Sequence, residues 1–371
     1  MKGTWAAGIL AAAVLLTGCG GGLPRAREMG EMALMRTMGV DGNGEGTLAV
    51  TVSTGKRAVG TQGGTAAPLI LYAESPSLSG ACREIQGLSS YHVFYGYVDQ
   101  ILLGESMALQ GVEPVLEYLS RDVELGLGAQ IWLVRDGSAQ SAIESGGESG
   151  VEEQLSILRK SRELGVGGLT RTAEEVFQDI LEQGGTYLPA LHCVPSEQEG
   201  EASLLEWGYG VLREDRLVGY LEGDGARGLE LLAGQGNGDL LEVELSGGLA
   251  VVEIGQTTTQ FIPVYQQREL KEIHLVCQVN GALTEFPSPM EGEEVNRLRE
   301  LVEQQETQKI QRALDQLRSW RVDCVGIGHQ LSMAAPEGWR WIEEDWERLF
   351  VNVPITVTVQ ATINRTYGDL G

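Results

Sequence analysis

The sequence has 371 residues, an ordinary hydrophobic share of 42%, and 52 acidic residues against 27 basic ones, which gives a formal net charge of −25. A chain this acidic repels phosphate backbones and anionic headgroups, so we expect neither nucleic-acid binding nor a polybasic membrane-binding face. The length favours two or three domains.

The first residues have the features of an exported segment. Lys2 precedes an apolar run at residues 5–16, which is shorter than the ~20 residues needed to span a bilayer. The run Leu16-Thr17-Gly18-Cys19 resembles a bacterial lipobox, which implies cleavage before Cys19 and a diacylglycerol thioether on its sulfur. The alternatives are an ordinary signal peptide or a short membrane anchor. We predict a lipoprotein signal peptide at 1–18, and the lipidated Cys19 with a Gly-rich tether at 19–30.

Strands and helices alternate through the next part of the chain. A glycine-dense turn at 41–46 separates two strand patterns, and it lacks the glutamate that a calcium loop needs at its twelfth position, Val52. The further predicted elements are strands at 69–73, 89–103 and 130–134, and helices at 78–88, 107–109 and 112–119. This alternation is typical of mixed α/β packing.

Four short motifs in this region resemble the Ger(x)C lipoproteins, the C subunits of spore germinant receptors. They are Gly39-Val40-Asp41, Tyr95-Gly96, Leu103-Gly104-Glu105 and Leu119-Ser120-Arg121-Asp122. Their order and spacing carry the resemblance, because each motif is short.

A loop is expected at 138–150, followed by helices at 151–165 and 174–182 and a strand at 187–194. The acidic stretch that follows contains proline and glycine, which indicates a linker at 196–202. We therefore predict an N-terminal α/β domain at 31–195 and a C-terminal germination-protein domain at 203–371.

The C-terminal part begins with a predicted hairpin, strands 203–213 and 216–221. A short helix follows, with Asp224 as its expected N-cap, Leu229 inside it and Gly234 as its stop. A strand that delivers such a helix is similar to the Ger(x)C pattern.

The same stretch also fits Gly-x-Gly-x-x-Gly through Gly223, Gly225 and Gly228, which is the pattern of a dinucleotide site. Glu222 and Asp224 would repel a pyrophosphate at that helix start. The preceding strand belongs to a hairpin rather than to a parallel βαβ unit, so this alternative is disfavoured.

Four strands are predicted at 240–245, 249–254, 260–265 and 272–279, with the spacing of an antiparallel sheet. The helix expected at 291–320 has an apolar stripe and would be on the order of 40 Å long. A coiled coil is the alternative, but glutamines interrupt the stripe, so we expect this helix to pack across the sheet. The stripe residues are Val295, Leu298, Val302, Ala313, Leu314 and Leu317.

The region after this helix gives the most specific match to the Ger(x)C family. Asp323, Gly326 and Gly328 form an Asp-x-x-Gly-x-Gly turn, and two tryptophans seven residues apart can face one core. A strand at 355–359 closes the chain. The resemblance covers nearly the whole mature chain, and its motif residues are Asp41, Gly96, Gly104, Glu105, Arg121, Asp122, Asp224, Leu229, Asp323, Gly326, Gly328, Trp339, Trp346 and Phe350.

We expect an α+β fold with mixed or antiparallel sheets packed against helices. Neither the four histidines nor any Gly-x-Ser-x-Gly pattern supports catalysis or a metal site, so we predict no enzyme, no cofactor and no metal. Disulfides remain open for an exported chain, but buried free thiols are favoured. The cysteines concerned are Cys82, Cys193, Cys277 and Cys324.

The resemblance implies a membrane-anchored lipoprotein subunit of a nutrient germinant receptor, on the outer face of the inner spore membrane. It implies assembly with integral membrane A and B subunits, and response to a small-molecule germinant through the complex. The alternative is a solute-binding lipoprotein of a transport system, which would have two doubly wound lobes around a ligand cleft.

Overall fold

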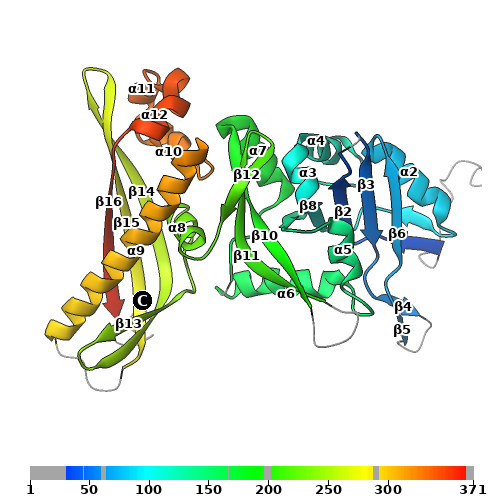
Figure 1. The fold of residues 1–371 in the computed structure, drawn as a ribbon, viewed down its shortest axis with the longest axis horizontal. Helices are drawn as coiled ribbons and strands as arrows, with labels where there is room; N and C mark the ends of the chain where they lie inside the picture. The colour runs from blue at the N-terminus through cyan, green and yellow to red at the C-terminus, as the bar shows by residue number, and fades with distance from the viewer. Residues whose placement is uncertain are drawn as a thin grey trace, which may run out of the picture.

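The computed structural model describes residues 31–44, 46–59, 64–165, 167–195, 202–286 and 292–364. They form two lobes, which we call the N-lobe (residues 31–221) and the C-lobe (residues 222–364), and which lie side by side in Figure 1. The predicted signal peptide, Cys19, the tether and nearly all of the predicted linker lie outside the described residues.

An eight-stranded mixed sheet forms the centre of the N-lobe, in the order β12-β11-β10-β9-β8-β2-β3-β6. Its inner strands pair in parallel, and the strands toward both edges pair antiparallel. The strands are β2 (Thr37–Gly42), β3 (Leu48–Ser53), β6 (Ile70–Ser75), β8 (Gln100–Gly104), β9 (Gln130–Val134), β10 (Gly185–Pro195), β11 (Ala202–Arg213) and β12 (Arg216–Leu221). Two short pairs lie outside it, namely β1 (Met32–Leu34) with β7 (His92–Phe94), and β4 (Arg57–Val59) with β5 (Gly64–Ala66). The single strand expected at 89–103 is wrong, because a turn with a hydrogen bond from Val98 N–H to the Tyr95 carbonyl divides it into β7 and β8, which belong to different sheets.

This sheet continues across the predicted linker at 196–202. Strands β10 and β11, on either side of it, pair antiparallel, with Cys193 opposite Leu204. The pairing differs from two domains joined by a linker, since β11 and β12 complete the N-lobe sheet. The polar composition of the connecting stretch could be read from the sequence. The pairing of the strands on either side of it could not, because pairing depends on long-range contacts.

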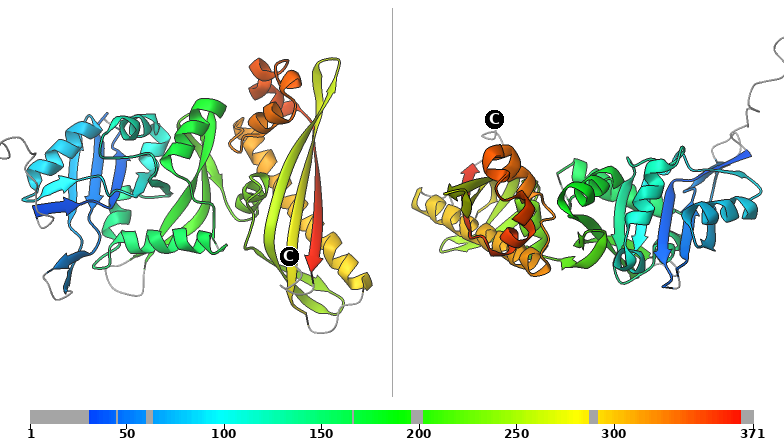
Figure 2. Two further views of the ribbon diagram at one scale, coloured as in Figure 1. Left: turned by 180° about the vertical axis from the view of Figure 1, so that it is seen from behind. Right: turned by 90° about the horizontal axis from the view of Figure 1, so that it is seen from above.

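Helices cover both faces of the N-lobe sheet (Figures 1 and 2). They are α2 (Leu78–Leu88), α3 (Glu105–Gln110), α4 (Glu113–Arg121), α5 (Ala139–Glu144), α6 (Val151–Glu163) and α7 (Ala173–Gln183). Helix α2 has the predicted bounds and is capped by the Ser77 side chain. The expected loop at 138–150 is wrong, because it contains α5. The side chain of Asp41, from β2, accepts hydrogen bonds from the first backbone N–H groups of α5, which local sequence does not reveal.

The C-lobe is built on a four-stranded sheet, β13-β14-β15-β16. Its strands are β13 (Leu240–Leu245), β14 (Gly248–Gln266), β15 (Glu269–Glu285) and β16 (Ile355–Asn364). The antiparallel prediction is confirmed for the first three, whereas β16 pairs in parallel with β15. The separate strands expected at 249–254 and 260–265 are wrong, because both belong to β14. Pairing with β15 continues through the polar stretch between them, past a bulge after Ile254.

Helix α9 (Gly292–Trp320) crosses one face of this sheet, as predicted, with the short helix α8 (Asp224–Leu232) beside it (Figure 1). The remaining helices are α10 (Ile327–Ala334), α11 (Pro336–Trp339) and α12 (Trp346–Asn352). The α+β prediction is confirmed. Among the described residues, no helix is both long and apolar enough to cross a bilayer.

Two glycines explain how α8 begins and how closely it packs. Gly223 is the N-cap, with a φ of 48° that favours glycine, so the expected cap, Asp224, is instead the first residue of the helix and pairs with Arg312. A Cβ atom on Gly228 would lie 2.1 Å from the Lys309 carbonyl oxygen of α9. The glycine pattern therefore serves a turn and a helix contact.

We expect Gly228→Ala to destabilise the protein by about 1–3 kcal/mol, because the added methyl group forces α8 away from α9. The matched control is Gly225→Ala in the same helix, where the new Cβ would meet Leu221 at 3.4 Å. That control should be neutral or stabilising by up to about 1 kcal/mol. Urea unfolding measures both, and equal effects would contradict the close-packing role of Gly228.

Candidate functional site

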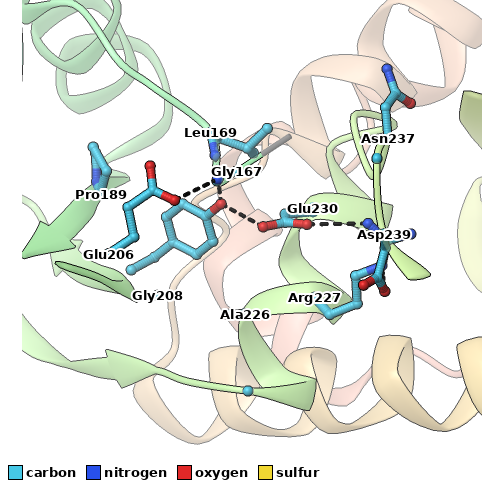
Figure 3. Close-up of a pocket in the computed structure, with 14 residues that line it drawn as sticks. Gly167, Leu169, Pro189, Glu206, Gly208, Ala226, Arg227, Glu230, Asn237 and Asp239 are labelled. Carbon is cyan, nitrogen blue, oxygen red and sulfur yellow. Dashed lines mark hydrogen bonds and ion pairs between the residues drawn. The ribbon is translucent and has the colours of Figure 1, made fainter. Parts of the chain in front are cut away.

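A cavity of about 300 Å³ lies where the two lobes meet (Figure 3). It is lined by the loop before α7, by β11, by α8 and by the loop before β13. The lining residues are Gly167, Gly168, Leu169, Pro189, Glu206, Gly208, Tyr209, Gly223, Ala226, Arg227, Glu230, Asn237, Gly238 and Asp239. Five of the lining residues are glycines, and the charged ones are Glu206, Arg227, Glu230 and Asp239.

Tyr209 connects the lobes through this cavity. Its hydroxyl donates to Glu230 Oε1 of α8 at 2.6 Å and accepts from the Leu169 backbone N–H at 2.7 Å. The ring is buried and packs edge-on against Tyr187 of β10, with centroids 5.5 Å apart. One phenol thus holds α8, the loop before α7 and the N-lobe sheet in a fixed relation.

Behind Tyr209 lies a buried ion-pair cluster, which we define as Arg227, Glu230, Asp239, Glu306 and Lys309. Arg227 Nη1 lies 3.2 Å from Glu230, and its Nε lies 3.1 Å from Asp239 and 3.4 Å from Glu306. Lys309 Nζ lies 2.7 Å from the other Glu306 oxygen. The Glu306 side chain is fully buried, so its charge depends on these two cations.

Sequence reasoning missed this cluster, although α9 carried a signal for it. Glu306 lies four residues after Val302 and four before Ile310, so it occupies a core-facing position of the helix. A glutamate at such a position needs a buried cation nearby. The partner, Arg227, is far away in sequence and cannot be assigned from spacing.

Burial sets the electrostatics of the cavity. It raises the pKa of the Glu230 carboxyl, against the hydrogen bond from Tyr209 and the charge of Arg227. It also raises the pKa of Glu206, against the N–H of Gly168, which donates to this carboxylate at 2.9 Å. Arg227 Nη2 is buried and has no hydrogen-bond partner among the described residues. A free donor beside buried carboxylates suits water or a small polar molecule.

The motif residues Asp41, Gly104 and Glu105 lie together in the N-lobe, at the ends of β2 and β8. Asp41 accepts from the N–H groups of Ala139 at 2.8 Å and Gln140 at 3.0 Å, and burial raises its pKa. A Cβ atom on Gly104 would lie 1.8 Å from Asp41 Oδ1, so only glycine leaves room for this carboxylate. Glu105 accepts from the Tyr220 hydroxyl of β12 at 2.7 Å.

The motif residues after α9 connect several elements of the C-lobe in a similar way. Asp323 accepts from the backbone N–H groups of Ile327 and Gly328 at 2.8 and 2.7 Å, and from Trp346 Nε1 at 3.0 Å. Burial raises the pKa of Asp323 despite these bonds. A Cβ atom on Gly328 would lie 2.5 Å from Trp346 Nε1.

The tryptophan pair faces one core, as predicted. The rings of Trp339 and Trp346 lie 5.4 Å apart, and those of Trp346 and Phe350 lie 5.9 Å apart. Gly326, with a φ of 71°, begins α10. This part of the motif therefore packs three short helices around one carboxylate.

The other motif residues lie elsewhere. Asp122 ends α4 and accepts from the backbone of Glu124 and Leu125, both at 2.9 Å, while Arg121 pairs with Glu117 at 3.1 Å. Gly96 follows β7, and Leu229 is buried in α8. The motif residues thus form separate contacts in different parts of the fold and do not converge on one site. Two of them, Asp224 and Leu229, lie on α8, beside the cavity.

The titratable groups offer no metal centre in the part of the chain that the structure describes, since no group of three or more His, Cys, Asp or Glu side chains has the right placement. The four described cysteines are unpaired. Three of them are buried, as expected of core thiols, and Cys193 is half-buried.

Comparison with known proteins divides the chain near the predicted linker and not at the boundary between the lobes. Residues 25–192 match the family model of the spore germination protein N-terminal domain, and residues 207–367 match that described as spore germination B3/GerAC-like, C-terminal. Together the two models cover most of the chain, and the chain belongs to the Ger(x)C family of spore germination proteins, the C subunits of germinant receptors.

Individual relatives agree with this assignment. Spore germination protein KC of Bacillus subtilis (strain 168) is 20% identical over 96% of this chain and 94% of its own length. The putative spore germination protein YfkR of the same organism is 22% identical over 82% of each chain. The crystal structure of the GerBC protein superposes with a TM-score of 0.54 at 16% identity, over 88% of this chain and 96% of that one, which establishes the shared fold.

We expect Asp323→Ala to destabilise the protein by about 3 kcal/mol, because two backbone donors and the Trp346 indole lose their acceptor in a buried site. The exposed Asp345, which pairs with Arg348 at 3.2 Å, supplies the control. Asp345→Ala should change the free energy of unfolding by no more than about 0.5 kcal/mol. Chemical unfolding of both variants tests this, and a small effect at Asp323 would refute its role as a joint.

The raised pKa of Glu206 predicts a pH dependence. The folded carboxyl keeps its proton to a higher pH than the unfolded one, so its contribution to stability falls as pH rises from about 4.5 through the raised pKa. In Glu206→Gln this fall should be smaller, whereas the exposed control Glu242→Gln should keep the wild-type dependence. Urea unfolding at pH 4.5 and pH 7 gives the change in the free energy of unfolding between the two pH values for each protein. An equal change in all three proteins would contradict the prediction.

Proposed function

We propose that this protein is a lipid-anchored C subunit of a nutrient germinant receptor and is required for spore germination. Cys19 would carry the anchor, and the two lobes would stand on the outer face of the inner spore membrane. There the protein would assemble with integral membrane A and B subunits and help the complex respond to a small-molecule germinant. Its contribution would be docking and not catalysis.

The observation that carries this proposal is the family match across both halves of the chain, preceded by a lipobox-like sequence that ends in Cys19. The structure supports a docking role, because the family-motif residues in it serve as joints between helices and strands. A solute-binding lipoprotein is less well supported. It would need two doubly wound lobes, whereas the C-lobe has an antiparallel β13-β14-β15 sheet covered by one long helix.

The anchor can be tested with Cys19→Ala in the producing organism. We expect this variant to incorporate no labelled palmitate, to leave the membrane fraction, and to slow nutrient-triggered loss of spore refractility, since acyl chains supply most of the membrane affinity. Cys193→Ala is the matched control, because Cys193 is a half-buried free thiol, and it should behave as wild type. Normal germination and membrane retention of Cys19→Ala would refute the proposal.

A further inference from the structure

Four large apolar side chains are exposed in the segments around α2 and β7 and just after α4. Helix α2 lies at the end of the N-lobe that is farthest from the C-lobe (Figure 1). Val123 is 99% exposed, Leu88 65%, Tyr97 54% and Tyr91 38%. We call these residues the apolar patch. Leu88 is the exception on α2, because the apolar residues Leu78, Ala81, Cys82 and Ile85 of this helix are buried.

Contacts around the short strand β7 hold the patch together. At its start, Gln86 of α2 donates to the Tyr91 carbonyl at 3.0 Å and accepts from Val93 N–H at 2.9 Å, which ties the last turn of α2, where Leu88 lies, to the segment that carries Tyr91. At its end, the Phe94 and Tyr97 rings pack edge-on at 5.8 Å.

The same end of β7 also holds the segment that carries Val123. The Tyr95 N–H donates to the Glu124 carboxylate at 3.0 Å, so Val123 lies close to the chain around Tyr97. Strand β7 has three residues and is roughly 10 Å long, so the backbone segments that carry the four exposed side chains lie near one another.

The chain enters the described structure beside this surface. Strand β1 pairs in parallel with β7, and Met32 lies opposite His92, the residue after Tyr91. Only the predicted tether, residues 19–30, separates this point from Cys19. Twelve residues reach at most about 40 Å, whatever their conformation. An acylated Cys19 would therefore keep the patch near the bilayer surface.

We propose that the apolar patch rests in the lipid–water interface of the membrane to which Cys19 is anchored, and so orients the N-lobe. This inference depends on the proposed acylation. Tyrosines favour the headgroup region, where an apolar ring and a polar hydroxyl are both accommodated. The acidic chain offers no polybasic surface, so the contact is apolar and persists at high salt.

The test uses the full acylated chain in phosphatidylcholine vesicles, with a fluorophore at residue 123 introduced by Val123→Cys. Cys193→Ser removes the half-buried thiol, and the other three described thiols are buried. Brominated lipid should quench this probe, in low and in high salt. A probe at Met333→Cys, on the exposed side of α10 in the C-lobe, is the matched control and should not be quenched.

A second variant separates the patch from the anchor. Leu88→Ser with Tyr97→Ser should abolish quenching at residue 123 while leaving the chain acylated and membrane-bound. Mass measurement of the acyl group comes first, and its absence would refute the proposed function itself. An acylated chain with an unquenched probe at residue 123 would overturn only the present inference. Shielding of the probe solely in the presence of integral membrane subunits would also overturn it, in favour of a protein contact.

Discussion

The packing of α8 against α9 and the loop before β13 depends on one buried arginine. Arg227 holds three carboxylates from three segments of the chain, and one of them, Glu306, is fully buried at the middle of α9. Removing one partner of a buried ion pair typically costs about 3–5 kcal/mol, because the other charge stays in a dry site. Since Glu230 also accepts from Tyr209, the arrangement of this cluster is linked directly to the N-lobe sheet. A shift of α8 would disturb both the ion pairs and the phenol contact.

Two of the motif residues, one in each lobe, make the same kind of contact. Asp41 in the N-lobe and Asp323 in the C-lobe are buried carboxylates that accept backbone N–H groups at the start of a helix. Gly104 leaves room for the Asp41 carboxylate, and Gly328 leaves room for the Trp346 indole that donates to Asp323. Helix N-termini favour negative charge, which offsets part of the cost of burial. These residues explain how the sequence specifies rigid joints between helices and strands, which suits the docking role proposed above.

Local periodicity predicted the elements whose signal lies within one segment, such as α2, β9 and α9. It failed where a distant partner decides the structure. Helix α5 begins on the Asp41 carboxylate, β14 continues through a polar stretch because β15 pairs with it, and β11 joins the N-lobe sheet across the predicted linker. The cavity has the same origin, since its walls come from segments between residues 167 and 239 that only folding brings together.

The parallel pairing of β15 with β16 has a consequence for how the chain is completed. Ile273 lies opposite Ile355, so the last strand can join the sheet only after α9 and the short helices have been made. The Ala361 N–H then donates to Glu303 of α9 at 3.0 Å, which fastens the helix to the strand added last. A nonsense mutation just before β16 therefore leaves the edge of β15 open and prone to aggregation.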